Sequence, residues 1–538
     1  MVSALTSLRD AYWNDLEISD ADIDMIGNLL LEQEKPLTPR EMIRSLVEAR
    51  LVELEEQARK AAAPEHQTYL PSDTYEVGDR LVFPALSGAV GEVVKVRQGD
   101  NREIGPFRVI DVQFDGEGTA EQRSFASELN GHALNLAAES QAQSEGPETA
   151  DEVLEKYGSA IEEKLRKKLS QHDDIVQIAG RWFPASLLVD VHSGHLNLAE
   201  AVLDVAGGGP LPTTSLLEHI ELPEHTDPLL ASFSVDYALQ EDERFDEVGP
   251  AGQTLWYLRR LEPPEVLYTP PRLEYSPRSY DRGVLVEDLI KLESALDDEL
   301  SPVVEDEGPP AAVEPVTFPL LFPHWRVGAL PLSVRLQRLF PTAYEAPRIR
   351  FMLVDGHSGD KFPGWVVRQE KYVFGLDAWY RRYEVPAGGL VRIRPGEAPG
   401  EVIVEALERR RRNDWIRTVS IDDGKVGFTM LKQPVGTAYD DLMVIGLTDP
   451  MALDAAWMNG EQRRMDDEQL VLYVFRELAK LNPQSAVHAQ SLYSGVNVFR
   501  RLPPGPIFAE LCTRPHYEHV GDLYWRIDDV AMTRSSDS

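Results

Sequence analysis

The chain has 538 residues, with 54 Lys and Arg against 90 Asp and Glu, so its formal net charge is −36. A surface this acidic argues against nonspecific binding to DNA or to acidic lipid by the molecule as a whole. One hydrophobic core stops growing near roughly 250–300 residues, so the length predicts several domains. Cys512 is the sole cysteine in the sequence, which excludes an intramolecular disulfide and any zinc finger built on cysteines.

Neither a signal peptide nor a membrane span is expected. Residues 1–10 lack the apolar core of a secretory leader, and no run of roughly 18 apolar residues occurs. A sequence with so few cysteines fits a reducing compartment. We therefore expect a cytoplasmic protein that does not bind membranes.

Residues 1–60 predict two helices. Ser19 with Asp22 can cap the first, and Thr38 with Pro39 begins the second after the break at KPL. A short helix, the turn KPLTPREM and a second helix resemble the start of a winged helix of the HARE-HTH type, found in the RNA polymerase delta subunit. The alternative is an ordinary helical hairpin.

Residues 73–132 change to short alternating apolar runs punctuated by glycine, which predicts a small β-barrel. The stretch VGDRLVFPALSGAVGEVVKV resembles the Tudor/KOW-like barrels of transcription factors, including the CarD-like RNA polymerase binders. Residues 133–152 are rich in Ala, Ser, Gln and Glu and are expected to be a linker.

Residues 153–265 predict a winged helix preceded by a helix and a strand pair. Three helical segments lead to Phe245–Gly249 and then to a strand with Trp256 and Tyr257. Residues 465–530 repeat this order, with Tyr517–Gly521 followed by a second aromatic strand. Both segments resemble the HARE-HTH type of winged helix, and the N-terminal segment is a third candidate.

Residues 266–316 are Pro-rich and then acidic, and we expect a linker there. Residues 317–417 hold 17 Lys and Arg against 11 Asp and Glu, a local charge of +6, and predict a basic β-barrel. Residues 418–464 are expected to be a β or irregular extension. The segments GALPLSVRLQRLF, GLDAWYRRY and PAGGLVRIRPG resemble the plant-type DNA-binding pseudobarrel, although that family's phosphate-contacting N-terminal loop has no clear counterpart.

The basic barrel carries the candidate nucleic-acid contacts. Guanidinium groups can pair with phosphates or guanine edges, and aromatic rings can stack on bases. The alternative is that the arginines pair with Glu405, Glu408 and Asp414 as a solvated face. The candidates are Arg335, Arg338, Lys361, Arg368, Lys371, Trp379, Tyr380, Arg381, Arg382, Arg409, Arg410, Arg411 and Arg412.

The predicted third helix of the middle winged helix is acidic from Asp227 to Glu243, with no Lys or Arg before Arg244. Such a helix would be repelled by phosphate, so it predicts a protein-contact or DNA-mimicking surface. The C-terminal copy is less acidic.

Two short Asp/His groups could ligate a metal ion. The alternative, which we favour, is a pair of glycine turns with polar tips. The groups are Asp190, His192 and His195, and Asp355, His357 and Asp360.

The sequence contains no HExxH, P-loop, GxSxG or GxGxxG motif, and we expect no cofactor. The expected fold class is multidomain α+β, with winged helices plus small antiparallel β-barrels. The expected function is a non-enzymatic nucleic-acid-binding or RNA-polymerase-associated transcription regulator, with the basic barrel on DNA or RNA and the acidic winged helices on protein. The alternatives are a protein-interaction scaffold with a DNA-mimicking acidic surface, and a metal-dependent nuclease.

Overall fold

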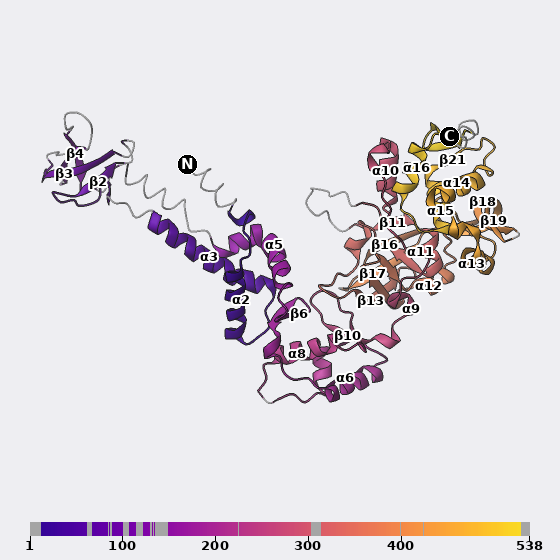
Figure 1. The fold of residues 1–538 in the computed structure, drawn as a ribbon, viewed down its shortest axis with the longest axis horizontal. Coiled ribbons are helices and arrows are strands. Elements are labelled where there is room, and N and C mark those ends of the chain that lie inside the picture. Colours follow the sequence, from indigo (N-terminus) through magenta and orange to yellow (C-terminus); the bar gives the residue numbers. More distant parts are fainter. Residues whose placement is uncertain are drawn as a thin grey trace. The chain divides into compact units, whose positions relative to one another are not determined.

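The structure is a computed structural model. It forms two compact units, Met1–Val176 with Arg181–Leu187, and Gln177–Gly180 with Leu188–Ser538. Both units combine helices and sheets (Figure 1), so the expected α+β class is confirmed in its general form. None of the helices in the described residues has the length and apolar character of a membrane span. The structure describes residues 12–61, 67–83, 86, 89–99, 107–114, 122–129, 132, 134, 149–223, 225–302, 314–398, 400–422 and 424–528.

The first unit contains three helices and most of a hairpin, here called the first module, and the turn of the hairpin, Gln177–Gly180, is assigned to the second unit. Ser19 and Asp22 form the expected capping box, as do Thr38 and Glu41. The fully buried residues Ile26, Leu30, Met42, Ile161 and Leu165 belong to its three helices. The elements are α2 (Asp20–Gln33), α3 (Pro39–Ala61), α5 (Ala150–Leu169), β6 (Ile175–Ile178) and β7 (Arg181–Pro184).

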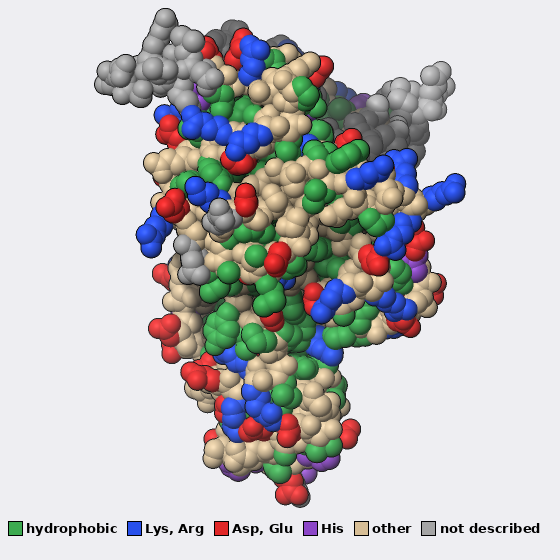
Figure 2. Space-filling view, turned by 90° about the vertical axis from the view of Figure 1, so that its right-hand side faces the viewer, with side chains coloured by type: hydrophobic (Ala, Val, Ile, Leu, Met, Phe, Trp, Pro, Cys, Tyr) green, Lys and Arg blue, Asp and Glu red, His purple; other side chains and the backbone are tan. Residues whose placement is uncertain are grey.

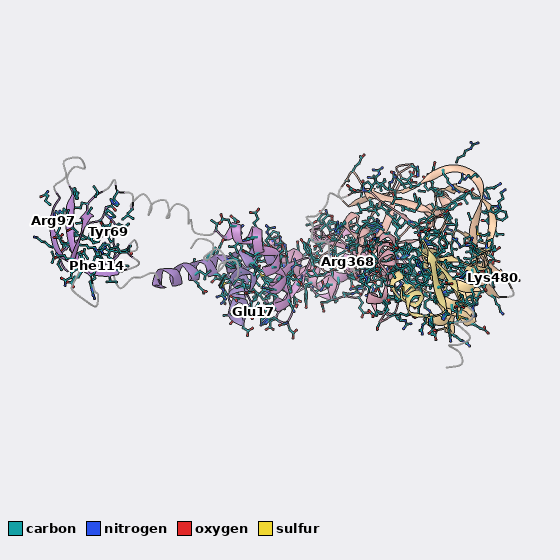
Figure 3. The ribbon with its side chains drawn as sticks, turned by 90° about the horizontal axis from the view of Figure 1, so that it is seen from above. Glu17, Tyr69, Arg97, Phe114, Arg368 and Lys480 are labelled. Carbon is teal, nitrogen blue, oxygen red and sulfur yellow. The ribbon has the colours of Figure 1, made fainter. Side chains whose placement is uncertain are left out.

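A five-stranded sheet is inserted between α3 and α5, and Figure 3 shows Tyr69, Arg97 and Phe114 within it. The strand order runs from β1 to β5. The sheet curls so that its two edges approach each other: the Tyr69 hydroxyl donates to the carbonyl of Ala126 at 2.7 Å, and Leu129 N–H donates to the carbonyl of Pro71 at 2.8 Å. β1 and β5 themselves do not pair as strands in the described residues. The strands are β1 (Gln67–Thr68), β2 (Arg80–Phe83), β3 (Ala89–Gln98), β4 (Arg108–Phe114) and β5 (Gln122–Ser127).

The second unit contains two further modules of the same kind. In the middle module the sheet order is β8-β10-β9, and in the C-terminal module it is β21-β23-β22. Both therefore pair a short early strand with the last strand of the hairpin. The middle module has α6 (Ser193–Val205), β8 (Leu211–Pro212), α7 (Thr213–Leu217), α8 (Pro228–Gln240), β9 (Phe245–Glu247) and β10 (Leu255–Leu258). The C-terminal module has α14 (Asp467–Ala479), β21 (Val487–His488), α15 (Ala489–Phe499), α16 (Pro504–Thr513), β22 (Tyr517–Gly521) and β23 (Tyr524–Ile527).

A buried tryptophan marks the last strand of each module. Each of the three pairs, through the backbone, with an apolar residue that lies just before the second helix. The first module thus follows the order of the other two, with the five-stranded sheet inserted before its third helix. The pairs are Trp182 with Leu37, Trp256 with Leu211, and Trp525 with Val487. The helix expected to precede the middle module, α5, instead packs against α3.

A seven-stranded sheet lies between the last two modules in the chain. Its order is β11-β16-β17-β13-β14-β15-β12, and β13 with β17 is its one parallel pair. The sheet is curled, and the short helices α11 (Phe322–Val327) and α12 (Asp377–Arg382) lie against it (Figure 1). The strands are β11 (Val316–Pro319), β12 (Ala329–Pro331), β13 (Arg348–Asp355), β14 (Lys361–Val367), β15 (Tyr372–Phe374), β16 (Leu390–Pro395) and β17 (Glu401–Ala406).

Two expected boundaries differ from the structure. The sheet ends at Ala406, and the long hairpin of β18 (Glu408–Asp422) and β19 (Lys425–Thr437) crosses the expected boundary at residue 417. The expected linker contains α10 (Glu287–Leu296), which packs on α16 because Leu289 joins the C-terminal core. The remaining elements are η2 (Ala185–Leu187), η3 (Arg259–Leu261), α9 (Pro264–Leu267), η4 (Arg282–Val284), η5 (Leu336–Leu339), β20 (Gly446–Leu447), α13 (Pro450–Asn459) and η6 (Glu461–Arg464).

Candidate nucleic-acid interface

The hairpin of β18 and β19 has a buried half and an exposed half. Near its turn, Val419, Val426 and Phe428 are buried in the C-terminal core. Over 408–415 and 432–437 most side chains on both strands are exposed or half-buried, and five Lys or Arg stand against two Asp or Glu. We call these two segments the exposed ribbon.

Trp415 is the large apolar side chain of the exposed ribbon, and 64% of its surface is accessible. It pairs across the ribbon with Lys432. Side chains alternate along a strand, so Asn413 lies on the same face as Trp415, whereas Arg411 lies in the irregular stretch of β18 between Glu408 and Arg412. The exposed aromatic ring therefore has a lysine opposite it and a polar side chain on its own face, close in sequence to the arginine run.

The arginine run is only partly neutralised by carboxylates. Arg409 and Arg412 share Asp414, and the Arg409 guanidinium also lies 4.3 Å from the ring centroid of Tyr439. Arg411 lies 3.1 Å from Glu384, but both side chains are more than half exposed, and such pairs contribute little. Arg410 has no ion-pair partner among the described residues.

The alternative is that the arginine run pairs with three acids. Of these, Asp414 does pair with the run, but Glu405 and Glu408 do not in the described part of the chain. Glu405 pairs with Arg394, at 2.8 Å, and so belongs to the seven-stranded sheet. Glu408 lies 4.0 Å from His357, and no arginine of the run pairs with it among the described residues. Free positive charge therefore remains on the exposed ribbon.

Most of the other candidate cations have an ion-pair or hydrogen-bond partner within the protein, although the pairs of Arg381 and Arg382 are as exposed as the pair of Arg411 and also contribute little. On the face in Figure 2, Lys and Arg side chains are interspersed with Asp and Glu. Arg338 is exposed and unpaired in the part of the chain that the structure describes. The engaged groups are Arg335 with Asp297, Lys361 with Glu401, Arg381 with Asp377, Arg382 with Asp360, Arg368 with the carbonyl of Ala346, and Lys371 with the carbonyl of Glu299.

Trp379 and Tyr380 do not fit the expected stacking on bases. Their side chains are only 4% and 3% exposed and belong to the core of the seven-stranded sheet. The Tyr380 hydroxyl donates to the carbonyl of Ala329, at 2.8 Å. Both rings hold α12 against the sheet, so neither presents a face to a ligand.

Neither Asp/His group forms a metal centre, and no cluster of three or more His, Cys, Asp or Glu suited to a metal occurs in the described residues. Asp355 is buried and accepts hydrogen bonds from His357 N–H, the Ser358 hydroxyl and the Tyr383 hydroxyl. These bonds close the turn after β13, and with burial opposing them they hold the pKa of Asp355 below its usual value. Asp360 instead pairs with Arg382.

The group around His192 has a structural role. The His192 side chain accepts from Gly194 N–H and caps α6, and its ring stacks on His195 at a centroid distance of 3.6 Å. Burial, and then the neighbouring His192, lower the pKa of His195. Asp190 forms no ligand cluster with these rings.

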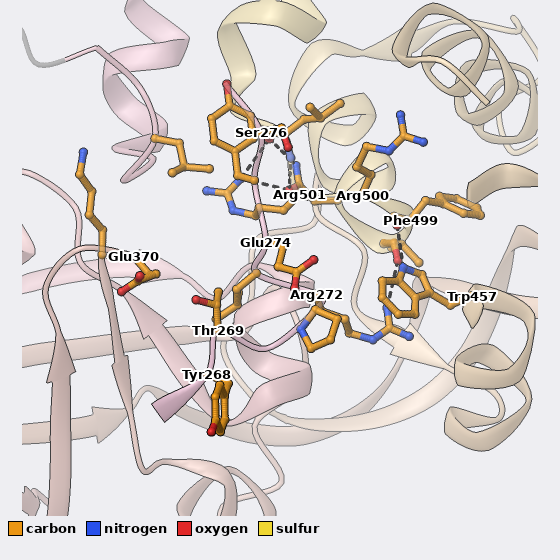
Figure 4. A pocket seen from close by; sticks show the side chains of 18 of the residues that line it. Tyr268, Thr269, Arg272, Glu274, Ser276, Glu370, Trp457, Phe499, Arg500 and Arg501 are labelled. Carbon is orange, nitrogen blue, oxygen red and sulfur yellow. Dashed lines mark hydrogen bonds between the residues drawn. The ribbon is translucent and has the colours of Figure 1, made fainter. Parts of the chain in front are cut away.

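A large pocket of about 980 Å³ lies between the extended segment 267–278, the turn 369–371 and the C-terminal module. Figure 4 shows Arg272 beside Trp457, with the guanidinium 4.6 Å from the ring centroid. Arg272 also donates to Asp454, at 2.6 Å, and Arg501 pairs with buried carboxylates behind the wall. Carboxylates therefore already neutralise these two cations.

Sequence reasoning missed Trp415 and Lys432. Trp415 follows the arginine run by three residues, which is the signal that could have singled it out. Lys432 is brought opposite by strand pairing and has no local signal. Comparison with known proteins adds nothing here, since no family model, no curated protein and no solved structure matches the chain.

Proposed function

We propose that this chain is a non-enzymatic, nucleic-acid-binding regulator, and that the exposed ribbon is its contact with DNA or RNA. The observation that carries the proposal is the exposed Trp415 paired with Lys432, next to the incompletely neutralised run 409–412. Exposure of an apolar indole ring to water is energetically unfavourable. An exposed tryptophan beside cationic side chains is well suited to bind a ligand that has both aromatic rings and phosphates.

The geometry of a two-stranded ribbon supports this role. Such a ribbon fits the major groove, where arginine forks can contact guanine, and an exposed indole can stack on an unpaired base. The long-range field of the molecule opposes binding, because the net charge is −36. Affinity must therefore come from close contacts at the ribbon, and it should fall steeply with salt.

The three modules have the element order of winged helices, and we interpret them as such. The third helices of the middle and C-terminal modules are poor candidates for reading a groove. α8 contains Asp236 and no Lys or Arg, and α16 packs against α10. We assign these modules to scaffolding and protein contact, with transcription-associated proteins as the expected partners.

The curled seven-stranded sheet supports the pseudobarrel interpretation. The LP segment lies on β12, the Trp379 segment forms α12, and the Gly-Leu-Val segment begins β16. In this interpretation the sheet is a platform that holds the ribbon through its junction at Leu407, whose N–H donates to the carbonyl of Leu390 at 3.1 Å.

The experiment is a fluorescence-anisotropy titration of the full chain with single-stranded and double-stranded oligonucleotides at several salt concentrations. We expect Arg410→Ala/Arg411→Ala/Arg412→Ala to weaken binding at least about tenfold and to flatten the salt dependence. Trp415→Ala should weaken single-strand binding by roughly 1–3 kcal/mol.

The control for a single charge is Arg526→Ala, compared with Arg410→Ala alone, and it removes an exposed arginine from another hairpin of the same unit. It should leave affinity unchanged. If the wild-type chain binds no oligonucleotide at low salt, or if the triple variant binds as tightly as the wild type, the proposal is wrong.

A further inference from the structure

The middle module carries a groove of about 870 Å³. Its walls come from the segment 188–191, from Leu196 on α6 and from α8 with the turn that follows it. Ser234, which is 2% exposed, accepts from Val189 N–H at 3.0 Å and fixes the first wall to α8. The groove is therefore built from locked backbone rather than from a loose loop.

The floor of the groove is apolar and only half-buried. Leu188, Val189, Val191, Leu196 and Tyr237 all line it with part of their surface accessible. Half-exposed aliphatic side chains in a concave surface favour a ligand that brings an apolar anchor. Burying each such side chain more fully would contribute to binding in proportion to the area covered.

The rim of the groove is acidic and largely unpaired. Asp190, Glu241 and Glu243 line it and are exposed, and no Lys or Arg pairs with them in the described residues. The one cation of the rim, Arg244, is held by Asp242 and by Glu200, both at 2.7 Å. The uncompensated charge is therefore negative.

We propose that this groove is a docking site for a Lys/Arg-rich protein segment that carries aliphatic or aromatic anchors. Charge complementarity selects this occupant: three free carboxylates attract ammonium and guanidinium groups, and they repel phosphate. The apolar floor receives the anchors between the charges. The proposal is independent of the exposed ribbon, which lies on other elements and has the opposite charge.

The test uses the full chain and three labelled peptides of equal length. The first alternates Lys and Leu, the second replaces Lys by Glu, and the third replaces Leu by Ser. We expect the Lys/Leu peptide to bind, the Glu/Leu peptide not to bind, and the Lys/Ser peptide to bind more weakly. Salt should weaken the first interaction, because the rim charges are exposed.

The variant is Glu241→Lys/Glu243→Lys, which should weaken the Lys/Leu peptide at least about fivefold. The matched control is Glu287→Lys/Asp288→Lys on α10, where two exposed acids are changed by the same charge. Because distant exposed charges are screened, this control should change affinity less than about twofold. A thermal melt of each variant checks that the fold is intact.

Three results would overturn the proposal. One is that no peptide binds to the wild-type chain. Another is that the α10 control weakens binding as much as the groove variant, since the effect is then net charge alone. The third is self-association of the chain that is lost both in Glu241→Lys/Glu243→Lys and in Arg410→Ala/Arg411→Ala/Arg412→Ala, which would assign the groove to the ribbon of a second copy rather than to a partner protein.

Discussion

The indole Nε1 of Trp256 lies 2.8 Å from Oδ1 of Asp236, and both side chains are buried in the middle module. Thr213 also donates to this carboxylate. Burial raises the pKa of Asp236 to about 6, although both hydrogen bonds act in the opposite direction. The hydrogen bonds that join β10 to α7 and α8 thus become sensitive to pH.

This raised pKa predicts a pH-dependent stability. The pKa of Asp236 in the folded protein lies above the ordinary aspartate value of 3.8, so the stability contributed by the protonated carboxyl is complete below pH 3.8 and is lost as pH rises through about 6. Asp236→Asn removes this loss and keeps an oxygen acceptor for Trp256. The stability of the variant relative to wild type should therefore rise by roughly 2–3 kcal/mol between pH 4 and pH 7. Calorimetry across that range measures it, and a constant difference would contradict it.

We expect mutation of a buried tryptophan to lower the folding stability much more than mutation of the exposed Trp415. Trp256→Ala should destabilise its module by about 3–5 kcal/mol, because it removes a fully buried ring and one of the two hydrogen-bond donors to Asp236. Trp415→Ala should change stability by less than about 0.5 kcal/mol, because its ring is 64% exposed. Denaturant unfolding with limited proteolysis compares the two. Equal losses would mean that Trp415 packs against the protein, and the ribbon assignment would then fail.

A buried ion cluster joins the expected linker to the C-terminal module. Arg501 lies 2.7 Å from Asp298 and 2.8 Å from Glu299, and all three are almost fully buried. Arg501→Met removes the guanidinium from two buried carboxylates, of which only Glu299 keeps a basic neighbour, His324 at 3.0 Å, and should cost roughly 3–5 kcal/mol. The triple variant with Asp298→Asn and Glu299→Gln should recover most of that loss, since no uncompensated charge remains.

Thermal unfolding of the four forms (wild type, Arg501→Met, the double amide variant and the triple) gives the coupling energy. Additive losses across the cycle would contradict the cluster.

We expect the turn after β13 not to bind divalent cations. Asp355 already accepts from His357 N–H at 3.0 Å, from Ser358 at 2.9 Å and from Tyr383 at 2.6 Å. We expect Mg²⁺, Mn²⁺ and Zn²⁺ to leave the melting temperature unchanged, and no cleavage of oligonucleotides to appear. If a divalent metal raises the melting temperature and Asp355→Ala abolishes that rise, this expectation is wrong and the metal-dependent nuclease becomes the favoured function.

Local signals in the sequence predicted the helix starts well. The cap at Ser19 and the Asp227–Pro228 start both form as expected, since a cap needs only residues within one turn. The repeated hairpin near Trp256 and Trp525 was visible for the same reason. Its third copy at Trp182 was missed, because the five-stranded sheet separates it from the helices to which it belongs.

The candidate site was harder to predict, because residues distant in the sequence determine whether a charged side chain is paired or free. Arg335 and Lys361 are neutralised by Asp297 and Glu401, neither of which is a sequence neighbour. Trp379 looked available beside two arginines, but the curl of the sheet buries it. Exposure of Trp415 follows from the hairpin extending beyond its own core, which no local pattern indicates.

The three modules that contain a buried tryptophan on their last strand can be compared with one another. All three place a buried indole opposite Leu37, Leu211 or Val487, so this pair is what the shared topology requires. The surroundings of this pair differ among the modules. The first module has an inserted sheet, the middle module has an acidic groove, and the C-terminal module packs against α10. Three copies of one architecture have thus been free to specialise separately, and surface substitutions in one copy should leave the folding of the others untouched.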